Sequence, residues 1–216
     1  MLDFSLLIKS LPQLIYACKN TLLIAFFSTL IGIIGGTLIA LGLRSLFTPL
    51  RWFLRIYITI IRGTPMVVQI IFLYYAIRLP FSPLVIAIIA IGLNSCAYIS
   101  QVITSGINAV SDGQREAATV MGFSQLQVMR YIILPQALRI VLPSLGNEFI
   151  TLIKDSSLAY IIGVNELFKE GRNLTNLTYD VITIYVAVTF LYLIMTYSLT
   201  LCVQELEKRW DASCSS

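Results

Sequence analysis

The feature that most constrains this chain is a series of long stretches almost free of charged residues. A helix needs about 20 mostly apolar residues to cross the roughly 30 Å hydrocarbon core of a bilayer. Because such stretches recur along the chain, the expected fold class is all-α, an integral membrane bundle forming a single domain over 1–216. The predicted transmembrane helices are at about 21–43, 52–77, 84–108, 138–164 and 181–204.

Two of these predicted spans are interrupted. The second contains Arg62 and then Gly63-Thr64-Pro65, which must loosen the helix and predicts a kinked span. The fourth is interrupted by the charged residues Glu148, Lys154 and Asp155, so the absence of charge cannot be used to locate its ends. The first span is regular and rich in glycine, which predicts close packing against a neighbouring helix.

The composition excludes most soluble and enzymatic classes. The chain is 57% hydrophobic and 12% charged, so a soluble domain would expose apolar surface and aggregate. It contains no histidine, which excludes HExxH zinc sites and Ser/His/Asp triads. An enzyme is therefore not expected, and neither a metal nor a cofactor is predicted in the chain.

The remaining composition argues against other sites. The cysteines lie far apart and form no CxxC motif, so they are predicted to be buried apolar residues (Cys18, Cys96, Cys202 and Cys214). The 15 basic residues are scattered, so we expect no nucleic acid partner, and lipid is the expected surrounding.

Loop charges predict the orientation. Cytoplasmic loops of membrane proteins carry an excess of Lys and Arg. With the N-terminus outside and the C-terminus in the cytoplasm, eight basic residues lie inside and five outside. The inside set is Arg44, Arg51, Arg55, Arg115, Arg130, Arg139, Lys208 and Arg209, and the outside set is Lys9, Lys19, Arg78, Lys169 and Arg172.

Polar residues form a stripe along the third predicted span. Asn94, Tyr98, Gln101, Ser105 and Asn108 recur every three or four residues and share a sector of about 80° of a helix. Lipid cannot satisfy these groups. They either bond to neighbouring helices as packing contacts or line a water-filled pathway, and both readings remain open.

The fourth span repeats the pattern with ions. Charges at membrane depth normally pair, line a cavity or serve transport. Lys154 and Asp155 could also lie in water at the interface, and Arg62 could extend to the cytoplasmic headgroups. The stripe comprises Ser144, Asn147, Glu148, Thr151, Lys154 and Asp155.

The longest polar connection, at about 109–135, predicts two short helices. Residues 114–121 are helix formers, Gly122 breaks the helix, and Ser124 can cap a second helix from 125 to about 132. Pro135 then starts the next segment. Its apolar side chains predict a protein partner with a groove, with a membrane-surface helix as the alternative: Val120, Met121, Phe123, Leu126 and Met129.

Several motifs in the chain resemble a known family. Glu-Ala-Ala at 116–118, Gly122 after three intervening residues and Ile-Ile-Leu-Pro at 132–135 are similar to the EAA loop of ABC-importer permeases. Arg-Gly-Thr-Pro at 62–65 followed by Gln69 resembles the signature of the polar amino acid subfamily, which includes histidine, glutamine, glutamate, arginine and opine permeases. The segments 93–98 and 154–158 resemble further motifs of that subfamily, and the resemblance covers about 14–210.

The resemblance implies an ABC type I permease fold in the cytoplasmic (inner) membrane. Its implied partners are a second permease chain, identical or related, a cytoplasmic ABC ATPase dimer and an extracytoplasmic amino-acid-binding protein. The ATPase-coupling residues would be Glu116, Ala117, Ala118, Gly122, Leu134 and Pro135. With the two stripes, the amino acid pathway would comprise Asn94, Tyr98, Gln101, Asn147, Glu148, Thr151 and Asp155.

The chain departs from the family at two positions. Relatives commonly carry an acid where Gln101 stands and an Arg where Thr104 stands, so we hypothesise that an ion pair was replaced as a unit. The chain also has no GxxxxGK[ST] motif, so ATP and Mg²⁺ would bind the separate ATPase subunit. The alternative function is a subunit of an ion-gradient-driven secondary transporter, with Glu148 and Asp155 as coupling carboxylates.

Overall fold

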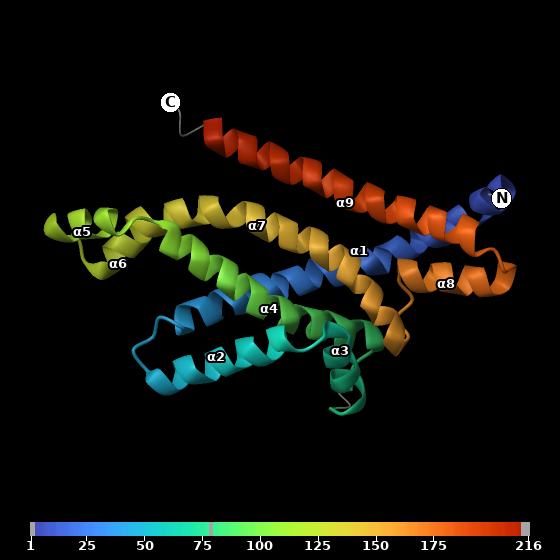
Figure 1. Ribbon diagram of the computed structural model, residues 1–216, viewed down its shortest axis with the longest axis horizontal. Helices are drawn as coiled ribbons and strands as arrows, with labels where there is room; N and C mark the ends of the chain where they lie inside the picture. The colour runs from blue at the N-terminus through green and yellow to red at the C-terminus, as the bar shows by residue number, and fades with distance from the viewer. Residues whose placement is uncertain (1–2, 78–79, 213–216) are drawn as a thin grey trace.

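The structure, a computed structural model, describes residues 3–77 and 80–212, and the elements in these ranges are helices (Figure 1). Arg78 and Cys214 lie outside them. The helices are α1 (Phe4–Gly42), α2 (Thr48–Gly63), α3 (Met66–Tyr75), α4 (Pro83–Ala109), α5 (Asp112–Val120), α6 (Gln125–Gln127), the π-helix η1 (Val128–Ile133), α7 (Leu134–Asp155), the 3₁₀-helix η2 (Ser156–Ile162), α8 (Leu167–Thr178) and α9 (Val181–Ala212).

Helix α1 is much longer than the predicted first span of 21–43. It runs for 39 residues, about 58 Å, and starts where the Asp3 carboxylate accepts hydrogen bonds from the backbone N–H groups of Ser5 and Leu6. The pattern of charge-free residues detected only the second half, because Lys9 and Lys19 interrupt the first. The second helix of comparable length, α9, also continues beyond the predicted residue 204.

The second predicted span is not a single kinked helix. Helices α2 and α3 meet at 108°, so the chain turns sharply at Thr64 and Pro65 rather than continuing across the membrane in one direction. Proline lacks a backbone N–H and restricts the preceding residue to extended conformations, which Thr64 adopts with ψ 146°. The sequence located the break but underestimated its angle.

Helices α1 and α4 make the most extensive contact between elements in the part of the chain that the structure describes. Helix α4 is also the span whose predicted limits, 84–108, match the structure within one residue at each end. A Cβ added to Gly32 would lie 2.5 Å from the Ser95 hydroxyl oxygen, and one added to Gly36 would lie 2.8 Å from Ile99. The glycines therefore allow the two backbones to approach as the sequence predicted.

The fourth predicted span, 138–164, begins earlier than expected and changes helix type before its end. Helix α7 begins at Leu134, ahead of the predicted 138, and its α-helical part ends at Asp155. The chain then tightens into η2 and stops at Gly163, which has a φ of 90°. Lys154 and Asp155 consequently lie in the last α-helical turn, directly before this change of helix type.

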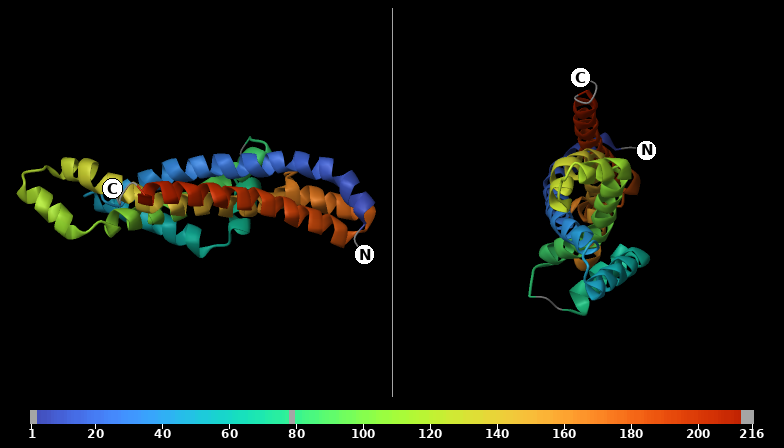
Figure 2. Two further views of the ribbon diagram at one scale, coloured as in Figure 1. Left: turned by 90° about the horizontal axis from the view of Figure 1, so that it is seen from above. Right: turned by 90° about the vertical axis from the view of Figure 1, so that its left-hand side faces the viewer.

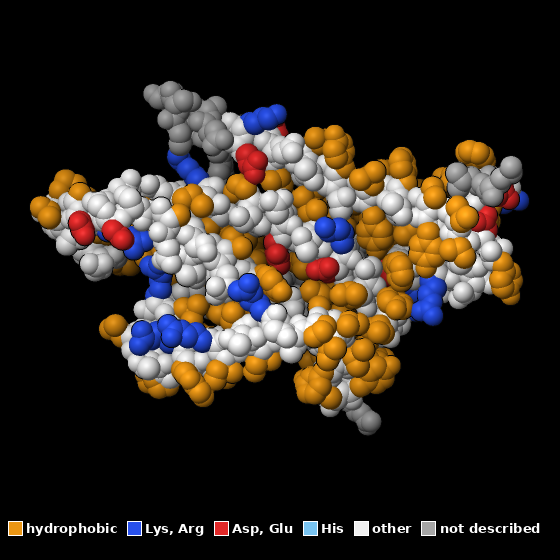
Figure 3. All heavy atoms as spheres, viewed as in Figure 1, with side chains coloured by type: hydrophobic (Ala, Val, Ile, Leu, Met, Phe, Trp, Pro, Cys, Tyr) orange, Lys and Arg blue, Asp and Glu red, His pale blue; other side chains and the backbone are white. Residues whose placement is uncertain are grey.

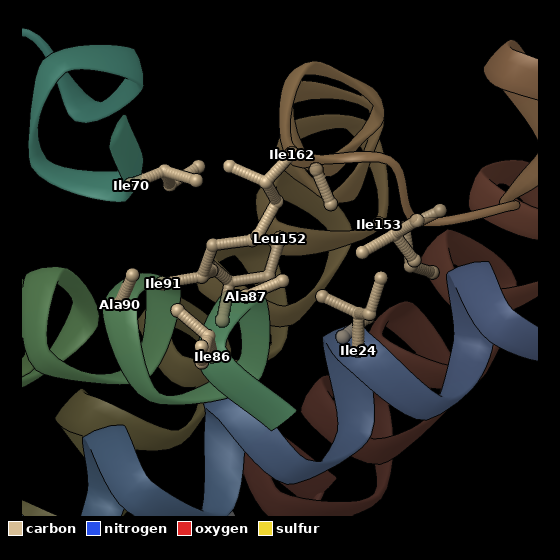
Figure 4. Close-up of a cluster of buried hydrophobic side chains, with 12 residues drawn as sticks. Ile24, Ile70, Ile86, Ala87, Ala90, Ile91, Leu152, Ile153 and Ile162 are labelled. Atoms are coloured by element: carbon tan, nitrogen blue, oxygen red, sulfur yellow. The ribbon is translucent and has the colours of Figure 1, made fainter. Parts of the chain in front are cut away.

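The core lies where α1, α3, α4, α7 and η2 meet. Ile24, Ile70, Ile91 and Leu152 are fully or almost fully buried there, together with Ile162 (Figure 4). The molecule is elongated, with α5 and α6 protruding at one end and α8 at the other (Figure 2). The start of α1 lies at the α8 end, and α9 runs from there towards the α5 end (Figure 1).

The cysteines only partly follow their prediction. Cys96 is buried between α4 and α1, where its thiol donates to the carbonyl of Ile31, and Cys18 is half-buried. Cys202 is exposed on α9, so its predicted burial is wrong. Its helix is apolar on nearly all sides, and the sequence does not reveal which side meets the bundle.

Candidate functional site: a protruding loop and a polar face

The segment from α5 to η1 has the predicted form of two short helical pieces around a glycine. Gly122 has a φ of 87°, in the left-handed region. Its N–H donates to the Thr119 carbonyl at 3.0 Å, and the Phe123 N–H donates to Ala118 at 3.1 Å. This pair of bonds is a Schellman motif, in which the left-handed residue is usually glycine, sometimes asparagine, and most other residues are strained.

The second piece begins as predicted at Ser124. The Ser124 hydroxyl accepts from the Gln127 N–H at 3.4 Å, and the Gln127 side chain accepts from the Ser124 N–H at 2.8 Å. This capping box stabilises the start of α6. The helix then passes through η1 into α7, where Leu134 and Pro135 occupy the start, so the predicted second short helix is continuous with the next long one.

The loop exposes one side and buries the other. Val120, Met121 and Leu126 are 88%, 71% and 77% exposed, as the docking prediction requires. Phe123 and Met129 are instead half-buried against a small core with Val128 and Ile133. Of the predicted coupling residues, Ala118 faces this core, while the others are exposed: Glu116, Ala117, Gly122, Leu134 and Pro135.

The polar stripe of α4 begins with a structural contact. Asn94 is 4% exposed, and its side-chain amide donates to the Gln69 amide oxygen at 2.9 Å. The Gln69 amide nitrogen in turn donates to the carbonyls of Ile61 and Thr64, at 2.8 and 3.1 Å. Gln69 therefore satisfies groups freed by the break between α2 and α3, and Asn94 orients it.

The next member of the stripe contacts a cation. Tyr98 is 39% exposed, and the central carbon of the Arg62 guanidinium lies 5.3 Å from the centre of its ring. This is a cation–π contact between α2 and α4. Arg62 therefore contacts α4, although its side chain is exposed.

A polar pocket of about 520 Å³ follows along α4 towards the α5 end. Gln101 and Thr104, the two positions of the hypothesised ion-pair replacement, both line this cavity. Arg55 of α2 also lines it, and Arg44 donates to the Asn108 side chain at 2.7 Å across its far end. The pocket therefore lies between α2, α4 and the turn that follows α1.

The polar residues of α7 lie on the adjoining side of α4. The Ser95 hydroxyl donates to the Glu148 carboxylate at 3.1 Å, and Asp155 is half-buried. Asn147 and Thr151 are exposed, although the Thr151 hydroxyl donates to the Asn147 carbonyl of its own helix. Figure 3 shows acidic side chains near the centre of one face, over α7, and basic ones over the start of α2.

One buried ionisable residue escaped the sequence reasoning. Glu166, at the start of α8, is fully buried and accepts from the N–H groups of Phe168 and Lys169, at 2.7 and 2.8 Å, and from the Tyr192 hydroxyl at 3.1 Å. Burial raises the pKa of Glu166 to about 7, although these bonds oppose the shift. Its partners come from α8 and α9, and no spacing in the sequence signals them.

The helices, protruding loop and polar face define a multi-pass membrane permease, and comparison with known proteins identifies the family. Residues 28–212 match the family described as binding-protein-dependent transport system inner membrane component. The chain belongs to this family.

Individual relatives agree with this assignment. The chain is 37% identical to the glutamine transport system permease protein of Escherichia coli, covering 96% of this chain and 97% of that protein. It is 40% identical to a probable amino-acid ABC transporter permease protein of Bacillus subtilis, over 87% and 84% of the two chains. These relatives are named as permeases, which favours an ABC permease over the secondary-transporter alternative.

Solved structures support the fold. The crystal structure of an amino acid ABC transporter with histidines aligns with a TM-score of 0.92 and 33% identity, over 97% of this chain and 99% of that one. An inward-facing structure of the MetNI methionine ABC transporter aligns with a TM-score of 0.75, and its 19% identity supports the fold alone. The type I ABC permease fold expected from the motifs is therefore confirmed.

Proposed function

We propose that this chain is one of two permease halves of an ATP-driven importer of polar amino acids. The observation that carries the proposal is the protruding segment from α5 to η1, a capped, rigid element with an apolar outer surface at one end of a permease fold. The names of the relatives support amino acids as the cargo.

The proposed orientation puts the α5 end in the cytoplasm. Helix α9 runs towards that end and α1 starts at the opposite end, in keeping with an odd number of crossings. Arg115 and Arg130 lie in the protruding segment, consistent with the excess of basic residues in cytoplasmic loops. The N-terminus would then be outside, facing an extracytoplasmic amino-acid-binding protein.

The protruding segment would dock on the ATPase subunit. Val120, Met121 and Leu126 provide an apolar contact that fits a groove on a folded partner. ATP and Mg²⁺ would bind that partner, and closure of its dimer would draw the two permease halves together.

The polar face would line the amino acid pathway. Tyr98, Asn147 and Thr151 are exposed members of the polar stripes on α4 and α7, and exposed polar groups at membrane depth need water or another protein. A second permease half covering this face would enclose a polar passage. Glu148 and Asp155 lie on α7 where they could attract the ammonium group of an amino acid.

The test is purification of the tagged chain from its native membrane in mild detergent. A P-loop ATPase should copurify, and Gly122→Asp should remove it, because aspartate adds backbone strain and a charge to the docking surface. Gly122→Asn is the matched control, since asparagine tolerates the left-handed conformation without adding charge. Full ATP-dependent uptake by Gly122→Asp, with the ATPase still bound, would refute the docking role.

A further inference from the structure

The two sides of the polar face carry opposite formal net charges. Residues 4–111 contain no Asp or Glu, and within them α2 and the loop before it carry Arg44, Arg51, Arg55 and Arg62. The α7 stripe carries the acidic residues Glu148 and Asp155 and the exposed basic residue Lys154, so its formal net charge is −1. Helix α4 lies between α2 and α7, so its polar stripe separates a strongly cationic side from one with a small net negative charge.

Two arginines of α2 lie alongside the polar stripe of α4. Arg55 and Arg62 are seven residues apart, which places them on the same side of α2. Arg62 lies at the level of Tyr98, whereas Arg55 lines the pocket beside Gln101 and Thr104. Guanidinium groups therefore lie beside the stripe at two successive levels along α4, first at Tyr98 and then, nearer α5, at the pocket.

The positive charge is not neutralised locally. In the described ranges, no carboxylate lies within ion-pair distance of Arg62, Arg55 or Arg44. None of the pocket's lining residues is acidic, and its other polar groups are the side chains of Thr59, Gln101, Thr104 and Asn108. Burial, and to a smaller extent the charge of Arg115, lower the pKa of Arg44.

We propose that Arg62, Arg55 and Arg44 form the carboxylate-binding side of the pathway. Arg62 binds the α-carboxylate of the amino acid beside Tyr98, and the Arg55–Arg44 pocket receives it next, towards the cytoplasm. This assignment rests on the proposed function and specifies its substrate class as amino acids with a free α-carboxylate, oriented with that group towards α2. A guanidinium suits the role because it stays charged and binds both oxygens of a carboxylate at once.

An anionic lipid headgroup is the competing occupant, since basic pockets between transmembrane helices also bind such headgroups. Two observations favour the amino acid. Arg62 is stacked on a member of the α4 stripe, and the pocket is lined by later members of the same stripe. The cationic path thus continues the polar face instead of opening separately to lipid.

The experiment uses the assembled permease–ATPase complex without its binding protein, in phosphatidylcholine nanodiscs. Binding of L-glutamine and of L-glutamine amide, whose carboxylate is replaced by a neutral group, is titrated by saturation-transfer NMR. Wild type should bind the amino acid at least tenfold more tightly than the amide. Arg62→Gln and Arg55→Gln should each weaken amino acid binding about tenfold or more and leave amide binding unchanged.

The controls separate this role from a structural one. Arg51→Gln removes an arginine of the same helix that does not line the pocket, and it should bind like wild type. Arg62→Lys, which keeps the charge, should retain part of the preference and remains informative if Arg62→Gln fails to assemble.

Three outcomes would overturn the inference: equal binding of acid and amide by wild type, unaltered preference in Arg62→Gln and Arg55→Gln, or loss of amino acid binding when phosphatidylglycerol is added to wild type. The proposed function fails separately, if wild-type complex supplied with its binding protein and ATP imports no amino acid. If wild type imports amino acids but the arginine variants keep the wild-type preference for acid over amide, only the carboxylate assignment is overturned.

Discussion

The side-chain amide of Asn94 donates a hydrogen bond of 2.9 Å to the amide oxygen of Gln69 and so links α4 to the break between α2 and α3. Gln69 uses its amide nitrogen on the carbonyls of Ile61 and Thr64, which the break leaves without helical partners. A residue predicted to line the pathway therefore has a structural contact that accounts for its burial.

Gln69→Glu tests this contact. Glutamate keeps the size of the side chain but removes the amide donors, so the carbonyls of Ile61 and Thr64 lose their partner. We expect a loss of about 1–3 kcal/mol in stability, measured as a lower melting temperature of the purified complex in detergent. Gln69→Met, which removes both donor and acceptor without adding charge, should fall between Gln69→Glu and wild type. A glutamate variant as stable as wild type would contradict the role.

Glu166 predicts a pH dependence of stability. Its pKa in the folded protein is about 7, above its ordinary value of 4.5, so the folded state holds the proton more tightly than the unfolded state. The stabilisation is fully present below about pH 4.5 and is lost as the pH rises through 7. The melting temperature should therefore rise by several degrees as the pH falls from 8 towards 5.

The matched variant is Glu166→Gln, which should flatten that pH dependence because it cannot ionise. Glu170→Gln, at a half-buried site of the same helix, should leave the dependence as in wild type. If Glu166→Gln keeps the slope of wild type, another group is responsible.

A substitution at Gly36 tests how much the close contact between α1 and α4 contributes to stability. A methyl group there would lie 2.9 Å from the Ile99 Cβ and 3.0 Å from the backbone nitrogen of Ser100, so Gly36→Ala should cost about 1–3 kcal/mol. At Gly113 nothing lies within 4 Å of an added Cβ, and alanine favours helix, so Gly113→Ala should be neutral or stabilising. Thermal melting of both variants tests the difference, and equal melting temperatures would argue against close contact in the membrane.

Gln101 and Thr104 share a pocket with Arg44 and Arg55, which sharpens the hypothesis that an ion pair was replaced as a unit. Thr104→Arg alone would add a third guanidinium to that pocket, and we expect poor assembly of the complex. The double change with Gln101→Glu should restore assembly. Gln101→Glu alone has two arginines nearby and should assemble normally, but it should reduce amino acid binding. Equal assembly of the single Thr104→Arg and the double variant would refute the pairing hypothesis.

The sequence by itself determined the class of fold, because long apolar stretches have few alternatives to helices in a membrane. It also located α4 within a residue at each end, the Gly122 turn and the Ser124 cap, since these depend on local backbone requirements. The stripes on α4 and α7 were visible because helical periodicity alone places their members on one side.

Only the tertiary structure decided which of these polar groups form hydrogen bonds that support the fold and which are exposed on its surface. The 108° turn between α2 and α3, the use of Asn94 to orient Gln69, and the burial of Glu166 beside Tyr192 join residues from separate helices. So does the approach of Arg62 to Tyr98, which places this arginine beside the polar face. Periodicity describes one helix at a time, whereas these contacts depend on how helices distant in the sequence pack together.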